Sequence, residues 1–256
     1  MNLNINDCFF IFINILYPSI RIFSFFYIVS IFNSNYFNMQ TKIFLSFMIS
    51  LIILPFIPLF QFNIFSLDGI LILLEQILIG ILIGFSINLI FSISSVSGEI
   101  FSFQTGLSFS NFFNENIFLK SSIMSCFLNS LIIILFLSLD GHLWMISTII
   151  KSFYIFPISF KFFDINILIS IVKLFSLIFI NGIYIIFPIM IILFFLNLSL
   201  CFLNKFIPQL SIFSIGFSII NFFGIFSFFI FLFHILFFLD NYLNKIYFKV
   251  SNIIFF

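Results

Sequence analysis

The chain has 256 residues, of which 63% are hydrophobic and 7% are charged, and its formal net charge is +1. Its mean hydropathy is +1.37, a value that excludes a soluble globular domain. The lack of any basic cluster argues against nucleic acid and against electrostatic docking to anionic lipid. Because every backbone amide in lipid must be satisfied within its own segment, the apolar runs are predicted to be helices of a polytopic membrane protein.

Apolar runs near or above spanning length follow one another, separated by short polar connections. The predicted spans lie at about 8–32, 43–62, 69–97, 122–139, 143–160, 165–203 and 210–239. Treating 122–150 and 165–203 as one span each gives about six apolar segments. Lysines then fall on both sides of the membrane, so the positive-inside rule gives no orientation. The first run lacks a basic n-region and a small-residue cleavage site, which favours a membrane helix over a signal peptide.

Two segments fit simple spanning helices badly. As one helix, 165–203 would be about 58 Å long, roughly twice the hydrocarbon thickness. A break at Asn181-Gly182 would leave a first piece that is short for a span, and Pro188 adds a kink signal. Either a long kinked helix leaves the bilayer, or a short hairpin packs against other subunits. The polar segment 98–121 is predicted to be irregular backbone, buried in protein or lining a cavity.

A small and polar ridge runs along the third span, with members every four residues at Gln76, Gly80, Gly84 and Asn88. Gly80 and Gly84 form a small-xxx-small pair, which permits close contact between helices in lipid. The ridge therefore predicts a closely packed partner helix. The pattern leaves open whether this partner belongs to the same chain or to another subunit.

The sequence offers no constellation for catalysis, a metal or a cofactor. His142 follows Asp140-Gly141, a dipeptide that favours a turn, and no metal-binding or nucleophile motif occurs. The cysteines are far apart and behave as small hydrophobic residues. Glu75 and Glu99 bracket the third span, where snorkelling or helix capping is favoured over a water-lined role. We therefore expect a protein that is not an enzyme.

Several stretches together resemble one family in the same order along most of the chain. They read PSIR at 18–21, EQILIGILIGF at 75–85, GEI at 98–100, QTGLSF at 104–109, GHLW at 141–144, NG at 181–182 with Pro188, and LNKFIPQLSIFSIG at 203–216. They are similar to FliR, an export-gate subunit of the flagellar type III secretion apparatus, related to SctT proteins of injectisomes. Lys205 stands where an arginine is common in the family, so a bidentate contact would be lost there.

The resemblance implies a single membrane domain over 1–256, with a FliP-like half at about 1–160 and a FliQ-like half at about 161–256. It implies helical hairpins in an assembly with FliP-like and FliQ-like subunits, working with FlhB-like and FlhA-like components. That assembly would pass unfolded flagellar proteins through the bacterial inner membrane at the flagellar basal body. No cofactor is implied.

The family's pore-closing loop maps onto the polar segment 98–121. The expected pore or plug residues are Gln104, Gly106, Ser108, Phe109, Phe112, Phe113 and Asn114. The alternative reading is a small-molecule transporter that binds at a broken helix near Asn181-Gly182, with Pro188 and Lys173 close by. A membrane hydrolase is disfavoured because no nucleophile, metal or base constellation is present.

Overall fold

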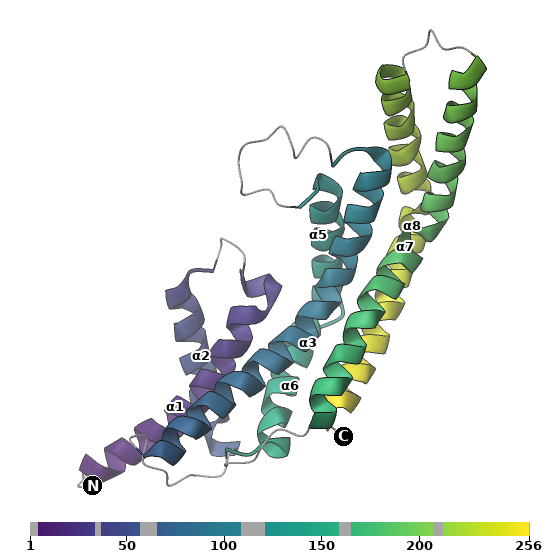
Figure 1. The fold of residues 1–256 in the computed structure, drawn as a ribbon. Coiled ribbons are helices and arrows are strands. Elements are labelled where there is room, and N and C mark those ends of the chain that lie inside the picture. The colour runs from purple at the N-terminus through teal and green to yellow at the C-terminus, as the bar shows by residue number, and fades with distance from the viewer. Residues whose placement is uncertain are drawn as a thin grey trace. The chain divides into compact units, whose positions relative to one another are not determined.

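The computed structural model describes residues 5–33, 37–56, 66–108, 121–158, 165–206 and 212–255, and every regular element in these ranges is helical. The elements are α1 (Ile5–Ile28), η1 (Ser30–Asn33), α2 (Met39–Ile53), η2 (Leu54–Phe56), α3 (Leu67–Thr105), α5 (Ile123–Ser138), α6 (Gly141–Ile155), α7 (Ile165–Phe206) and α8 (Ile212–Phe255). The predicted all-α fold is confirmed. Figure 1 shows the course of the chain.

In the described residues, four helical stretches are long and apolar enough to cross a membrane. They are Met39–Phe56, Leu67–Thr105, Ile178–Leu203 and Gly216–Lys245. Helices α5 and α6 are bent by 72° at their junction and count as a fifth span only if taken as one, while Phe12–Ile28 is a shorter apolar helix. The four spans, the bent pair and this shorter helix correspond to the about six apolar segments expected from the sequence. The chain is an all-α polytopic membrane protein.

Two predicted boundaries were wrong, at the C-terminal ends of α3 and α8. Helix α3 continues past residue 97 to Thr105, so the segment predicted to be irregular is helical over its first part. Helix α8 continues past residue 239 to Phe255, because polar residues end an apolar run without ending a helix. Helix α7, by contrast, agrees with the predicted span 165–203 and with the alternative of one long helix, since it runs unbroken through Asn181-Gly182 and Pro188. This continuity removes the broken helix needed by the transporter alternative.

The chain divides into two compact units: Met1–Leu89 with Asp140–Leu174 and Tyr247–Phe256, and Ile90–Leu139 with Phe175–Ile246. In the first unit, α1 and α2 form a hairpin (Figure 1). In helix α2, polar side chains are buried and large apolar side chains are exposed. Lys42, Ser46 and Ser50 are buried, whereas Phe44 and Ile52 are 60% and 69% exposed. An outer face of this kind requires lipid or protein, since water would hydrate the buried polar groups better than the exposed apolar ones.

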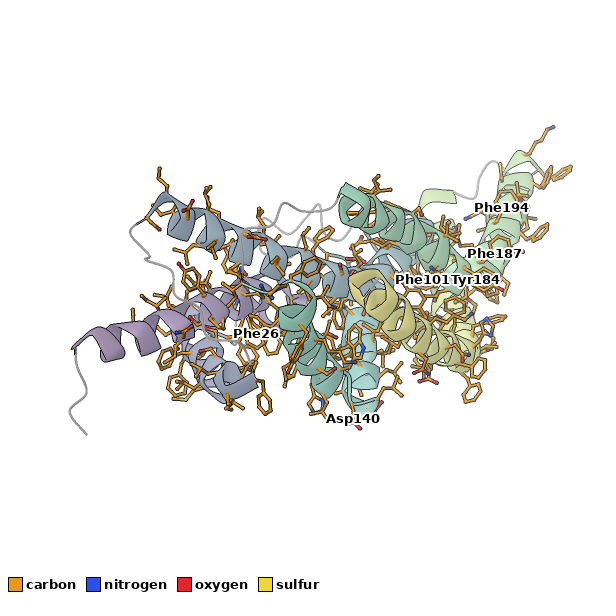
Figure 2. All side chains as sticks on the ribbon, turned by 90° about the horizontal axis from the view of Figure 1, so that it is seen from below. Phe26, Phe101, Asp140, Tyr184, Phe187 and Phe194 are labelled. Atoms are coloured by element: carbon orange, nitrogen blue, oxygen red, sulfur yellow. The ribbon has the colours of Figure 1, made fainter. Side chains whose placement is uncertain are left out.

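In the second unit, the stretches of α7 and α8 that belong to it lie side by side (Figure 1). The rings of Tyr184 and Phe238 are 5.1 Å apart, and Ile189 and Leu239 are buried. Large phenylalanines face outward instead: Phe187 and Phe194, labelled in Figure 2, are 52% and 56% exposed. The interior of the hairpin is thus mostly aliphatic, and most of its phenylalanines lie on the outside.

A sharp turn separates α5 from α6 at Asp140, which is labelled in Figure 2. Its backbone is left-handed, with φ of 54°, and among the described residues it is the one non-glycine with positive φ. Asp tolerates this conformation better than most side chains. The turn predicted at Asp140-Gly141 is confirmed, and His142 falls in the first turn of α6.

Candidate functional site

The two glycines of the ridge on α3 face α1 of the same chain. An ideal Cβ built on Gly80 would overlap the hydroxyl oxygen of Ser24 and the backbone carbonyl oxygen of Arg21. A Cβ on Gly84 would lie 3.0 Å from the carbonyl oxygen of Phe25. The helices therefore approach so closely that a side chain larger than hydrogen at Gly80 requires them to separate.

The polar members of the ridge meet the same partner. Gln76 Oε1 accepts a hydrogen bond from Arg21 Nε at 2.8 Å. Asn88 Oδ1 accepts one from the backbone nitrogen of Ser30 at 3.2 Å, just after α1 ends. All four ridge positions therefore contact α1 or the residues just after it in the same chain.

Arg21, the single arginine of the chain, is the centre of a buried polar cluster. It is 1% exposed. Its Nη1 donates to the carbonyl and hydroxyl oxygens of Ser152 at 3.1 and 3.3 Å, and its Nη2 donates to the carbonyl oxygen of Phe156 at 2.8 Å. Its guanidinium carbon lies 4.1 Å from the centroid of the Phe153 ring. Phe156 follows the last residue of α6, where carbonyl groups lack intrahelical partners, so these hydrogen bonds connect the end of α6 to α1 and, through Gln76, to α3.

Sequence reasoning placed Arg21 only within a family motif and gave it no role. The available signal was its uniqueness: a buried ionisable side chain in a membrane helix needs a dedicated set of partners. Ser152, its main acceptor, sits in an ordinary Lys-Ser-Phe stretch and carried no signal.

Three predicted pore residues lie at the described end of α3. Gln104 is partly buried in its last turn, Gly106 has a left-handed φ of 78°, and Ser108 is buried with its amide donating to the carbonyl oxygen of Ser102 at 3.3 Å. Glycine adopts positive φ at little cost, which suits a helix end. The other predicted pore residues lie outside the described residues: Phe109, Phe112, Phe113 and Asn114.

Glu99 caps the start of α5. Its Oε1 accepts hydrogen bonds from the backbone nitrogen of Ser122 at 2.8 Å and from the hydroxyl of Ser125 at 2.9 Å. The Ser122 hydroxyl in turn accepts a hydrogen bond from the backbone nitrogen of Ser125 at 3.2 Å. The capping hypothesis for Glu99 is confirmed, and the capped helix is α5 instead of its own.

Asn181-Gly182, the centre of the transporter alternative, lies inside the continuous helix α7. Gly182 packs against α3, where an added Cβ would lie 3.0 Å from a methyl of Val96. The side chain of Lys173 lies outside the described residues. Within the part of the chain that the structure describes, no group of three or more His, Cys, Asp or Glu side chains could hold a metal ion. Cys126 and Cys201 are free and exposed.

Comparison with known proteins fits this arrangement. Residues 12–246 match the family model described as bacterial export proteins, family 1. The chain is 45% identical over 206 residues to the flagellar biosynthetic protein FliR of Buchnera aphidicola subsp. Acyrthosiphon pisum, with 80% of each chain covered. The chain belongs to the FliR family. It is also 37% identical over 180 residues to FliR of Escherichia coli, covering 70% of this chain and 69% of that one.

Family membership fixes the general role. The chain is a component of the flagellar protein export apparatus and serves flagellum biogenesis as a membrane protein of that apparatus. A more distant FliR of Aquifex aeolicus is 29% identical over 206 residues, or 80% of this chain.

Proposed function

We propose that this FliR-family chain is a wall subunit of the flagellar export gate in the bacterial inner membrane. It assembles with FliP-like and FliQ-like subunits and works with FlhB-like and FlhA-like components. The gate passes unfolded flagellar proteins, and this subunit catalyses no reaction of its own. Residues 1–160 form the FliP-like half and 161–256 the FliQ-like half.

The observation that carries the proposal is the length of an exposed apolar face on α7. Exposed apolar side chains run from Phe175, which is 40% exposed, to Phe206, which is 79% exposed. At 1.5 Å per residue these positions are about 46 Å apart along the axis, whereas a hydrocarbon core is about 30 Å thick. Lipid covers only part of such a face. Other apolar protein surfaces must cover the rest, as in an assembly of helical hairpins.

A second observation indicates that the outer faces of α7 and α8 contact other proteins and not water. Only 22% of the most apolar stretch within Ile178–Leu203 and 28% of that within Gly216–Lys245 is buried inside the chain. Large phenylalanines dominate the exposed remainder, and aromatic side chains are enriched in the buried cores of protein interfaces. Subunits built from similar helical hairpins supply an apolar surface that can pack against these exposed side chains.

The pore segment is assigned to the region after the last turn of α3. Its proposed members are Gln104, Gly106, Ser108, Phe109, Phe112, Phe113 and Asn114. Polar groups and a left-handed glycine at the end of α3 support an exit from the helix at this point. The phenylalanines that follow supply bulk for a hydrophobic constriction, which resists ions by dewetting.

The test is ion leakage across the inner membrane in cells that hold the assembled complex. Deleting Ser108–Asn114 removes the bulk, so leakage should rise while the amount of complex stays largely unchanged. Replacing the three phenylalanines by Leu preserves apolar bulk and serves as the matched control, whereas replacing them by Ser should leak. Wild-type conductance in the deletion, with the deleted protein confirmed in the complex, would show that this segment does not close the pore.

A further inference from the structure

Helix α2 exposes an apolar face along most of its length. Between residues 43 and 56 every exposed side chain is apolar. Six of these side chains, which are 40% to 69% exposed, form what we call the outer face of α2: Ile43, Phe44, Phe47, Met48, Leu51 and Ile52. The outer face therefore offers a neighbour no side-chain donor or acceptor of hydrogen bonds.

The polar and small side chains of α2 lie on its opposite face, toward α1. Lys42, Ser46 and Ser50 recur every four residues, and all three are buried. The Ser46 and Ser50 hydroxyls donate to carbonyl oxygens of their own helix, each at 2.7 Å. The Lys42 ammonium lies 5.7 Å from the centroid of the Tyr27 ring of α1. The polar groups of α2 are thus placed inside the chain.

The distribution of side-chain size on α2 distinguishes lipid from a further protein helix. Contacts between helices in a bilayer are enriched in small residues, because these let the backbones approach each other closely. In α2 the serines lie on the inner face, and only large side chains remain on the outer face. Acyl chains adapt to large, flexible side chains without such a fit, so this arrangement favours lipid.

The lack of polar groups on the outer face points the same way. Protein interfaces carry about one hydrogen bond per 100–200 Å² of buried area, mostly around an apolar core. The outer face of α2 has no side chain that could take part in one. On α7, by contrast, the polar side chains of Asn197 and Ser199 are exposed among the phenylalanines.

The length of α2 matches the thickness of a bilayer. The apolar stretch Met39–Phe56 has 18 residues. At 1.5 Å per residue it is about 27 Å long, close to the ~30 Å of a hydrocarbon core. Exposed polar side chains lie at its start, namely Asn38, Gln40 and Thr41. Such residues suit the headgroup region, so lipid alone can cover the apolar face of α2, in contrast to the longer face of α7.

We propose that the outer face of α2 is a lipid-contact surface of this chain, covered by the acyl chains of the bilayer and by no other subunit. This inference goes beyond the proposed function, whose protein contacts lie on α7 and α8. Helix α2 then separates lipid from the buried Lys42, Ser46 and Ser50, and it joins the chain to the bilayer through large apolar side chains.

The experiment attaches a nitroxide spin label to single cysteines in the assembled complex, reconstituted in phosphatidylcholine vesicles. The three natural cysteines of the chain are replaced by Ser, and the complex with this cysteine-free chain supplies the background from other subunits. The labelled variants are Phe47→Cys and Ile52→Cys on the outer face and Thr41→Cys at its polar end. Collision rates are measured with oxygen, which concentrates in hydrocarbon, and with a neutral nickel chelate, which stays in water.

We expect labels at Phe47 and Ile52 to collide more often with oxygen than with the nickel chelate, and the label at Thr41 to show the reverse. Ser46→Cys is the matched control, since it lies next to Phe47 but is buried. This cysteine differs from the natural serine by one atom and should react with the label far more slowly than Phe47→Cys.

Two results would overturn the proposal. Low collision rates with both reagents at Phe47 and Ile52 would show that another subunit covers α2, while the export-gate role would stand. Frequent collisions with the nickel chelate at these sites would show that water contacts the face. If FliP-like and FliQ-like partners are absent from the purified complex, the proposed function fails instead, and the same labels on the reconstituted chain still decide whether lipid covers α2.

Discussion

Replacement of Gly80 by Ala should destabilise the chain even though Ala is the better helix former. In a helix interior exposed to water, Gly→Ala is worth up to about 1 kcal/mol in favour of Ala. At Gly80, however, the new methyl would overlap Ser24 Oγ and the Arg21 carbonyl oxygen, which belongs to the backbone of α1. Overpacking costs about 1–3 kcal/mol, so after the gain in helix propensity the net loss should be up to about 2 kcal/mol.

Gly84→Ala is the matched control on the same ridge. Its new methyl would meet the Phe25 carbonyl oxygen at 3.0 Å and its next neighbours at 3.4 Å, a contact that a small adjustment relieves. We expect a change near zero there. In a Ser24→Ala background, Gly80→Ala should recover only in part, because the backbone oxygen of Arg21 remains.

The assay is thermal unfolding of the detergent-solubilised complex, followed by circular dichroism at matched protein and detergent concentrations. The reasoning predicts that the melting temperature falls for Gly80→Ala and stays near wild type for Gly84→Ala. Equal melting temperatures for the two variants, or a larger drop at Gly84, would refute the close contact between α1 and α3.

Other predictions follow from single sites. Arg21→Lys keeps a charge but loses the guanidinium group that reaches both Gln76 and Phe156, so the free energy of unfolding should fall by about 2–4 kcal/mol. The loss is measured as a lower melting temperature and a lower abundance in the membrane. A wild-type melting temperature would contradict the role of the Arg21 cluster. Gly84→Leu should reduce the yield of assembled complex in a pull-down, and normal yield would count against tight packing at that position. Asp140→Gly should stabilise the chain by up to about 1 kcal/mol, measured as a slightly higher melting temperature, because glycine adopts positive φ freely. A lower melting temperature would show that the Asp140 side chain matters more than its backbone. Replacing the three cysteines by Ser and His142 by Gln should leave export of flagellar proteins within a few-fold, and an export defect in an intact complex would refute their lack of a chemical role.

The helices were predictable because lipid forces backbone satisfaction within each segment, so composition and length locate most of them. Their ends were harder to place. Helix α3 continues beyond the end of its apolar run because the polar side chains there have hydrogen-bond partners. Glu99 accepts a hydrogen bond from α5, and Ser102 donates one to the backbone of α3. A hydropathy scale does not take such partners into account. Helix α7 likewise passes Asn181-Gly182 without breaking because its glycine packs on α3.

The sequence predicted only part of the polar contacts. The four-residue period of the ridge indicated a close helix partner, since small residues at this spacing have few other uses in an apolar helix. Which helix it meets depends on tertiary contacts 55–58 positions away in the chain, as in Arg21–Gln76 and Ser30–Asn88. No local pattern encodes the bond from Arg21 to Phe156, at a separation of 135 positions.

The most direct measurement of the central claim is purification of the tagged chain from membranes in mild detergent, followed by identification and counting of its partners. A gate subunit with an exposed apolar face of about 46 Å on α7 should bring FliP-like and FliQ-like proteins with it in fixed ratio. Recovery of a stable, monodisperse single chain without these partners would contradict the account, because nothing would then cover the part of that face beyond the bilayer.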